Sequence, residues 1–309
     1  MDQKSTNLPG SIATWQRNLL VAAAVFTVLL IAMGGVLCVT QSIRNCPDWP
    51  GCYGSIFPPL ETGPVLEYTH RVLAALSGLL IISAAVAGVA RNWRIRWISL
   101  SPLVAIALLI VVSFFGAQVV LHGLAPGWAA VDVGSALLVV ALMVSTATIA
   151  SFRVNNPAHA VRLVYNTSFG KLAVAATAML YIVLVSGVLV AGKGSITGCL
   201  GWPIYSWSLL QADGHLIGNL LRLVLSAAGF VIILIVLVSA WRDRKEHPSI
   251  FNIARWLGAT LVLEIIFQVC ILVFGLLQPL LIIYTVVAAA LWALLVALMV
   301  RTGLTYALS

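Results

Sequence analysis

Residues 18–40 read NLLVAAAVFTVLLIAMGGVLCVT, an apolar run without a single charged side chain, and this run decides the class of fold. A helix of about 20 residues crosses the ~30 Å hydrocarbon core of a bilayer, so the run is long enough to span a membrane. Seven similar runs follow, and we predict eight spans at about residues 18–40, 66–90, 97–121, 128–151, 171–192, 213–240, 256–278 and 280–301. Because backbone groups in lipid must bond within their own segment, the chain is predicted to be an all-α integral membrane protein.

The charged residues predict how the spans are oriented. Only 8% of the residues are charged, whereas a soluble domain has about a quarter. Most of the 17 basic residues lie before the first span, in the segments 91–96, 152–171 and 241–255, or at Arg301. The positive-inside rule therefore predicts a multi-pass plasma-membrane protein with both termini in the cytoplasm. The basic residues form short clusters beside spans and no stripe, so we expect the lipid bilayer and no nucleic acid as a partner.

Two stretches of the chain resemble each other at a spacing of about 150 residues. The segment MGGVLCVTQSIRNCPDWPGCYG (33–54) aligns with VSGVLVAGKGSITGCLGWPIYS (185–206), and Arg71 aligns with Arg222. Because each half has an even number of spans, we predict two parallel-repeat four-helix bundles side by side. The predicted units are an N-terminal half (1–152), a cytoplasmic linker (153–170) and a C-terminal half (171–309).

Cys46 and Cys52 lie close together in the first predicted outer loop. The outer side of a plasma membrane is oxidising, which favours a disulfide between them, either permanent or reversible, over two free thiols. A zinc site is disfavoured, since no other cysteine or histidine is near in sequence to complete four ligands.

Ionisable side chains within spans are costly and mark functional candidates. Glu67 and His70 are three residues apart and share one helix face, whereas Arg71 points about 100° away from His70. Histidine commonly ligates haem iron, and a nearby carboxylate could tune it or move protons. The alternative is that these residues are polar anchors at a helix end. His122 and His215 are predicted at a similar membrane depth, Asp132 near the outer start of span four, and Glu264 inside span seven, where we expect a hydrogen bond to a neighbouring helix.

The ordered features resemble the haem A synthases. These features are the eight spans in two halves, the pair Gly34-Gly35, the loop CPDWPGCYG, and the motif ExxHRxLA at residues 67–74. The resemblance implies oxidation of a methyl group of haem O to a formyl group, which gives haem A for terminal oxidases. It also implies a substrate haem in one half and a haem b in the other, each between histidines of the second and fourth helices of its half. Haem O synthase or oxidase assembly proteins would be partners.

The resemblance carries over to this chain only in part. His70 stands at the family's first histidine, Glu67 at its essential glutamate, and Cys46 and Cys52 at its outer-loop cysteines. The other three ligand positions hold Asp132, Leu221 and Tyr284. The haem-contacting residues implied by the resemblance are His70, Arg71, His122, Asp132, His215, Arg222 and Tyr284.

Several arrangements could replace the missing ligands. His215 could ligate iron from nearer the surface, Tyr284 could do so as tyrosine does in catalase, and His122 could be the partner of His70. Otherwise the second half holds no haem and serves as a scaffold.

Three functions follow from these observations. The first is a haem-modifying oxidoreductase in which His70 holds the haem and Glu67 accepts protons or stabilises positive charge. The second is a non-catalytic haem-binding or assembly subunit of a respiratory complex. The third is a parallel-repeat transporter, which is disfavoured because proline gathers at span ends and not at mid-membrane.

Overall fold

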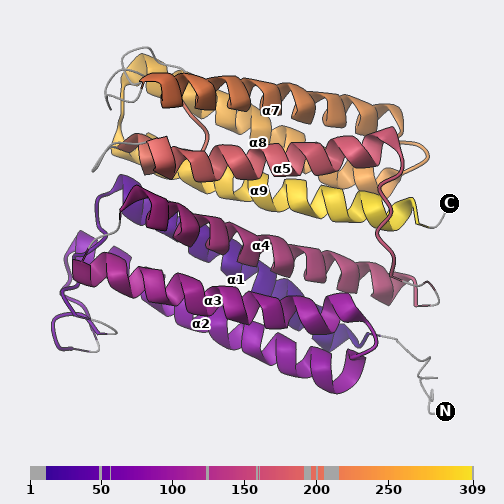
Figure 1. Cartoon of the computed structure of the whole chain (residues 1–309), viewed down its shortest axis with the longest axis horizontal. Helices are drawn as coiled ribbons and strands as arrows, with labels where there is room; N and C mark the ends of the chain where they lie inside the picture. The colour runs from indigo at the N-terminus through magenta and orange to yellow at the C-terminus, as the bar shows by residue number, and fades with distance from the viewer. Residues whose placement is uncertain are drawn as a thin grey trace.

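The computed structural model contains a helix at each of the eight predicted spans (Figure 1). It describes residues 12–48, 51–55, 57–122, 125–157, 159, 161–190, 196–199, 201–204 and 216–307, without the side chains of 119–121, 196 and 197. The elements are α1 (Thr14–Val39), α2 (Thr62–Asn92), α3 (Arg96–His122), α4 (Pro126–Asn155), α5 (Ser168–Val190), the short 3₁₀ helix η1 (Ile196–Cys199), α7 (Leu216–Arg242), α8 (Pro248–Phe274) and α9 (Gln278–Thr305). All eight α-helices are long and apolar enough to cross a bilayer, so the chain is a multi-pass membrane protein.

Proline sets the start of three of these helices. Pro126 and Pro248 are the first residues of α4 and α8, and Pro279 is the second residue of α9. Proline suits this position because its fixed φ is already helical and its missing N–H would have no intrahelical partner. Helix α8 begins eight residues before the apolar run that starts at about residue 256, because the polar turns from Pro248 onward are helical although they lie outside that run.

The helices pack as two groups of four. Each of α1 to α4 packs against two neighbours in that group, so α1 and α3 lie diagonally opposite each other, as do α2 and α4. Helices α5, α7, α8 and α9 form the second group in the same way, with α7 diagonal to α9. The groups meet where α1 and α4 face α5 and α9 (Figure 1). The boundaries of the predicted halves and their relation as parallel repeats stay predictions.

Close contacts tie the two groups together along this seam. Gly35 of α1 lies so near α9 that an added Cβ atom would be 3.0 Å from Cβ of Thr285. The indole N–H of Trp292 in α9 donates to the carbonyl of Leu137 in α4 at 3.1 Å, and both residues are buried. A disulfide joins Cys38 at the end of α1 to Cys199 of η1. The seam is therefore a packed and covalently linked interface.

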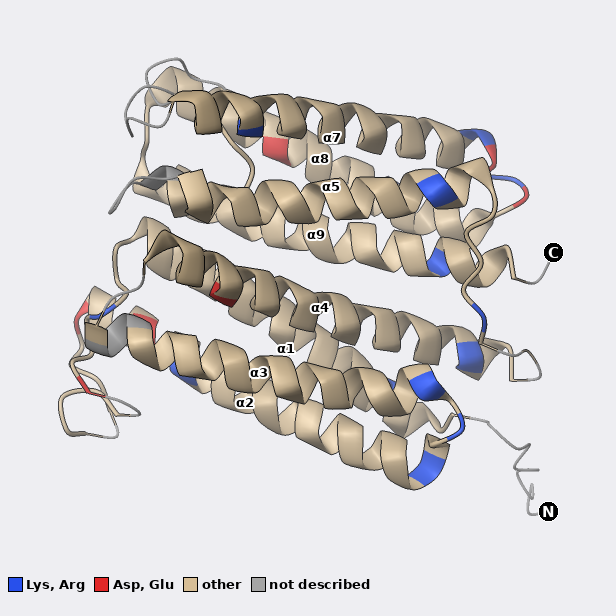
Figure 2. Ribbon diagram, in the orientation of Figure 1, with Lys and Arg blue, Asp and Glu red and all other residues tan. Residues whose placement is uncertain are grey.

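Charge is distributed unevenly between the two ends of the helices. Basic residues gather at the end where α1 begins and α9 ends, on the right of Figure 2. The opposite end carries the loop between α1 and α2 (Figure 1). This polarity is the one that the sequence predicts.

Candidate functional site

The loop between α1 and α2 is closed by a disulfide between Cys46 and Cys52, whose Cα atoms are 4.7 Å apart. Both cysteines are fully buried. The backbone groups of Cys52 and Ser55 exchange two hydrogen bonds of 3.3 and 3.2 Å, which form a tight turn with Tyr53 and Gly54 at positive φ. The predicted disulfide is present in the structure, and backbone hydrogen bonds within the loop hold its shape.

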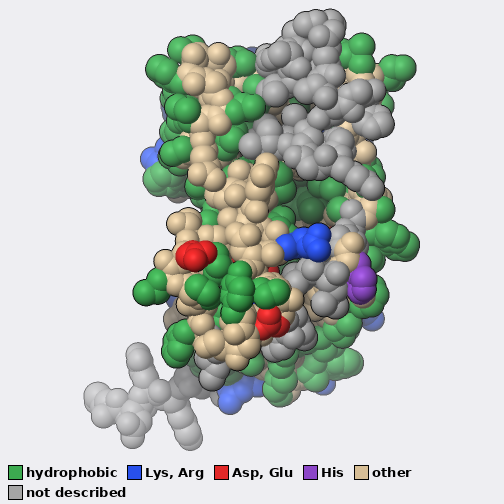
Figure 3. Space-filling view, turned by 90° about the vertical axis from the view of Figure 1, so that its left-hand side faces the viewer, with side chains coloured by type: hydrophobic (Ala, Val, Ile, Leu, Met, Phe, Trp, Pro, Cys, Tyr) green, Lys and Arg blue, Asp and Glu red, His purple; other side chains and the backbone are tan. Residues whose placement is uncertain are grey.

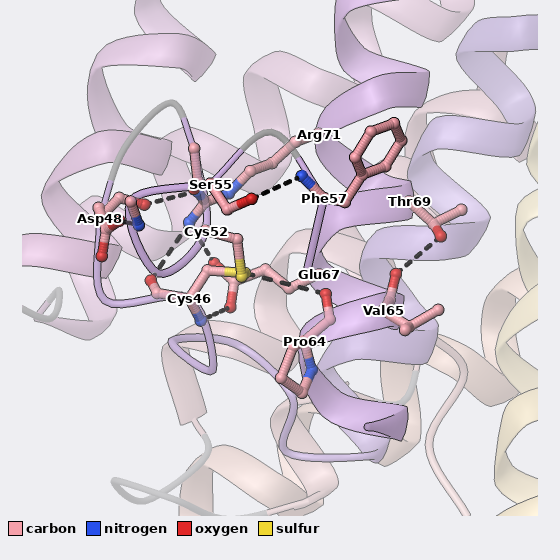
Figure 4. The surroundings of a disulfide bond; sticks show 12 residues. Cys46, Asp48, Cys52, Ser55, Phe57, Pro64, Val65, Glu67, Thr69 and Arg71 are labelled. Carbon is pink, nitrogen blue, oxygen red and sulfur yellow. Dashed lines mark hydrogen bonds and ion pairs between the residues drawn. A yellow bond between two sulfur atoms is a disulfide. The ribbon is translucent and has the colours of Figure 1, made fainter. Parts of the chain in front are cut away.

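Two side chains of α2 hold this loop in place (Figure 4). One carboxylate oxygen of Glu67 accepts the backbone N–H of Cys46 at 2.8 Å, and the other accepts the Arg71 guanidinium at 2.5 Å. The guanidinium also donates to the carbonyl oxygens of Asp48 at 2.6 Å and of Gly51. The loop is thus bonded to α2 at both ends of the disulfide ring.

Helix geometry explains why these two side chains act together. Glu67 and Arg71 are four residues apart, so they lie one above the other on one face of α2. Glu67 is 4% exposed, and charge-assisted hydrogen bonds in such surroundings are stronger than neutral ones. Removing one partner of a buried ion pair typically costs about 3–5 kcal/mol, because the other charge stays buried alone.

His70 lies about one helical turn after Glu67 in α2, and its hydrogen bonding differs from that of Glu67. Its Nδ1 atom is buried and has no hydrogen-bond partner among the described residues. Gly34 of α1 lies beside the ring, where an added Cβ would be 3.6 Å from Cε1 of His70. A buried polar atom without a partner is costly, so it points to a group that the protein itself does not supply.

Asp132 carries a second buried atom of this kind. Its Oδ1 has no partner among the described residues, and it lies in α4, diagonally opposite α2 in the first group of helices. The two unpartnered atoms therefore come from opposite helices of one bundle. Bundles commonly build cofactor sites between facing helices, and these two residues are the candidates for such a site between α2 and α4.

Of the other two predicted haem-ligating histidines, the structure describes only His122. His122 ends α3, is exposed, and has its Nδ1 atom 3.0 Å from Oε1 of Gln118. His215 lies outside the described residues. Among the described residues, no group of three or more His, Cys, Asp or Glu side chains could hold a metal ion.

In the second group of helices an arginine again bonds to a loop carbonyl, but the aligned haem-ligand positions hold no histidine. The Arg222 guanidinium donates to the carbonyl of Gly201 at 3.0 Å, as Arg71 does to Asp48. At the aligned ligand positions, Leu221 is 60% exposed on the outer surface of α7, and Tyr284 is fully buried and donates to the Trp202 carbonyl at 3.2 Å. These residues do not fit a haem held between two histidines.

One buried carboxyl group of the second half differs from its prediction. Glu264 of α8 is 2% exposed, and neither of its carboxylate oxygens has a hydrogen-bond partner among the described residues. The expected hydrogen bond to a neighbouring helix is therefore wrong for the described part of the chain.

The second disulfide, between Cys38 and Cys199, which are 161 residues apart, was not predicted from the sequence. A signal existed, since Cys38 is near the predicted outer end of span one and Cys199 lies in a predicted outer loop of the second half. Figure 3 looks onto this end of the molecule, where charged side chains are sparse among apolar side chains and backbone.

Comparison with known proteins places the chain in a family. A family model described as cytochrome oxidase assembly protein (COX15-CtaA) matches residues 60–296. A haem A synthase of Exiguobacterium sibiricum is 28% identical over 197 residues, which are 60% of this chain and 62% of the relative. The haem A synthase of Halalkalibacterium halodurans is 24% identical, covering 71% of this chain and 73% of the relative. That of Bacillus pumilus is 25% identical, covering 76% and 78%.

In the Exiguobacterium match, the chain spans about three fifths of the length of the relative. The family model covers much more than half of this chain and includes the α2 motif with Glu67, His70 and Arg71. The chain therefore belongs to the COX15-CtaA family of cytochrome oxidase assembly proteins, as a distant relative of the haem A synthases.

Proposed function

We propose that the first half binds haem O as its substrate through His70 and oxidises a ring methyl group to a formyl group, giving haem A, with water supplying the oxygen atom and an external electron acceptor taking up the four electrons while four protons are released. The observation that carries this proposal is the His70 imidazole, which has no hydrogen-bond partner among the described residues, with the unpartnered Oδ1 of Asp132 on the opposite helix. A neutral imidazole is a common ligand of haem iron. The haem A synthases to which the chain is similar support the same substrate.

Each residue near this site has a role in the proposal. His70 would ligate the iron, and Gly34 would leave room beside its imidazole ring. Asp132 would make the polar contact on the α4 side of the haem. Glu67 and Arg71 would keep the disulfide loop closed over the outer end of the bundle, with Glu67 adding a negative charge one turn from the iron ligand.

The second half would be a scaffold without haem b. Trp202 and Tyr284 are buried and bonded to each other there, and no histidine lies within α5, α7, α8 or α9 as the structure describes them. Its Arg222 would hold the loop at Gly201 as Arg71 holds the first loop.

The proposal includes an orientation. The basic end of the helices would face the cytoplasm, by the positive-inside rule, with both termini there and the disulfides outside the plasma membrane. The disulfides would then lie in the oxidising compartment.

The test is to purify the protein from cells that make haem O and to analyse its haem by pyridine haemochrome spectra and mass spectrometry. We expect haem O and haem A in the wild-type protein, at no more than one haem per chain. His70→Ala should remove the bound haem, whereas the control His122→Ala changes an exposed histidine and should retain it. Haem bound equally by both variants would contradict the proposal.

A second function is favoured by a different observation. Both oxygens of Glu67 are already bonded, to Cys46 and Arg71, and no described helix of the second half carries a histidine. These features suit a haem-binding assembly subunit that makes no haem A. In that case the purified protein would bind haem through His70, and no haem A would form when haem O is supplied.

A further inference from the structure

A cavity of about 380 Å³, widely open to the surface, lies on the seam between the two groups of helices, at the basic end of the molecule. Its walls come from both groups. Val21 and Ala24 of α1 and a row of α4 residues form one side, and Ile253 of α8 and Arg301 of α9 form the other. This end is far from His70 and from the disulfides, which lie at the opposite ends of the same helices (Figure 1).

The row on α4 changes in polarity along the helix. Val144, Ala147, Thr148, Ser151 and Asn155 all line the cavity, at spacings that keep them on one helix face. Eleven residues of helix rise by roughly 16 Å, so the cavity runs from deep in the apolar layer to the end of α4. The deep part is apolar at Val144 and Ala147, and the end near the membrane surface is polar at Ser151 and Asn155.

Arg301 supplies a positive charge at the polar end of the cavity. Its Nε donates to the Ser249 hydroxyl at 3.1 Å, and the guanidinium carbon lies 5.0 Å from the ring centroid of Phe152. No described acidic side chain pairs with it, and its two terminal nitrogens donate to no described residue. The side chain is thus fixed in direction while its donors remain free.

We propose that this cavity binds one anionic phospholipid from the leaflet on the basic side of the membrane. The acyl chain would lie along Ala24, Val144 and Ala147, and the phosphate would meet Arg301 with Ser151 and Asn155. A guanidinium matches the geometry of a phosphate group with paired donors. The polarity gradient of the cavity, from apolar Val144 and Ala147 to polar Ser151 and Asn155, is that of an amphiphile and not of a free ion.

The test measures lipid binding to the purified full chain in detergent. Native mass spectrometry would count retained lipids, and thermal unfolding would be followed while phosphatidylglycerol, phosphatidylcholine or inorganic phosphate is added. We expect phosphatidylglycerol to give one retained lipid and a higher unfolding temperature, with a weaker effect of phosphatidylcholine and none of inorganic phosphate. Because one basic residue near an anionic lipid adds measurably to its affinity, Arg301→Gln should weaken the binding of phosphatidylglycerol about fivefold.

The control is Arg255→Gln, which removes the same charge at the same end of the helices. Arg255 is exposed, lies over the ring of Trp256 and does not line the cavity, so this variant should bind phosphatidylglycerol as the wild type does. A second variant, Ala147→Leu, fills the apolar part and keeps Arg301, and it should also lose the lipid.

Three results would overturn the proposal. The first is an equal response to inorganic phosphate, which would show a free-ion site. The second is an equal response to phosphatidylcholine and phosphatidylglycerol, which would show a general lipid effect without charge recognition. The third is unchanged retention of phosphatidylglycerol in both Arg301→Gln and Ala147→Leu.

Discussion

Glu67 and His70 form an i,i+3 pair in the sequence, and Glu67 and Arg71 form an i,i+4 pair. Both spacings bring side chains together on a helix, so the sequence alone could not decide which partner Glu67 takes. The structure pairs Glu67 with Arg71 and with the N–H of Cys46, which comes from a loop 21 residues earlier. The sequence predicted the candidate residues of the site, but the contact that fixes Glu67 depends on the shape of the loop.

Replacement of Glu67 by glutamine should loosen the disulfide loop. Glutamine keeps the size of the side chain but loses the charge that binds Arg71 and strengthens the bond from Cys46. We expect the protein to lose about 1–3 kcal/mol of stability and the Cys46–Cys52 disulfide to be reduced faster by dithiothreitol. Thermal unfolding and thiol labelling over time would measure the two effects, and bound haem should be retained.

The control for this variant is Glu61→Gln. Glu61 is an exposed carboxylate at the start of α2 without a side-chain capping bond, so its removal should change neither quantity. A Glu67→Gln protein whose disulfide is reduced at the wild-type rate would show that Glu67 does not hold the loop.

At the scale of elements, the apolar runs predicted all eight spans but not where each helix ends. Helix α2 begins at Thr62 and α8 at Pro248, each earlier than its apolar run. Hydropathy reports which residues face lipid, whereas helix ends depend on proline, capping and contacts outside the membrane layer. The diagonal arrangement of α2 and α4, which the sequence did not predict, follows from packing that no local pattern contains.

Two glycines of α2 give a matched test of how closely α2 and α3 approach. A Cβ atom at Gly88 would lie 2.4 Å from the backbone carbonyl oxygen of Ile98, whereas one at Gly78 would meet nothing within 4 Å. Gly88→Ala should therefore destabilise the protein by about 1–3 kcal/mol through overpacking. Gly78→Ala should be neutral or stabilise it by up to about 1 kcal/mol, because alanine is the better helix former.

Thermal unfolding in one detergent would compare the two glycine variants with the wild type. Equal unfolding temperatures for Gly88→Ala and Gly78→Ala would mean that α2 and α3 are not in close contact at Ile98.

At the scale of the whole molecule, Cys38 and Cys199 join the two halves of the chain. The internal repeat aligned Cys199 with Cys46 and so gave it no partner. An alignment of repeats shows which positions are equivalent, but not which ones touch across the seam. The two four-helix groups could therefore be predicted from the sequence, whereas their covalent link could not.

This link predicts the behaviour of a cleaved chain. If a protease site is inserted after the exposed Pro157, in the connection between α4 and α5, cleavage should leave the halves joined by the disulfide. On a denaturing gel without reductant the pieces should migrate together, and dithiothreitol or Cys38→Ser should separate them. Cys270→Ser, which changes a free cysteine, should leave them joined. Separation of the wild-type pieces without reductant would exclude the link.

The order of the cysteines along the chain also has a consequence for biosynthesis. Cys38, Cys46 and Cys52 are synthesised long before Cys199. For much of translation, Cys38 can therefore form a disulfide only with Cys46 or Cys52, neither of which is its native partner. Once Cys46 and Cys52 have formed their disulfide, both residues are fully buried. Thiol–disulfide exchange requires a thiolate to reach one of the two sulfur atoms, so burial protects this disulfide from attack by Cys38. Early closure of the small ring would thus shield it from misoxidation and reserve Cys38 for the last pairing, which makes maturation a two-stage process.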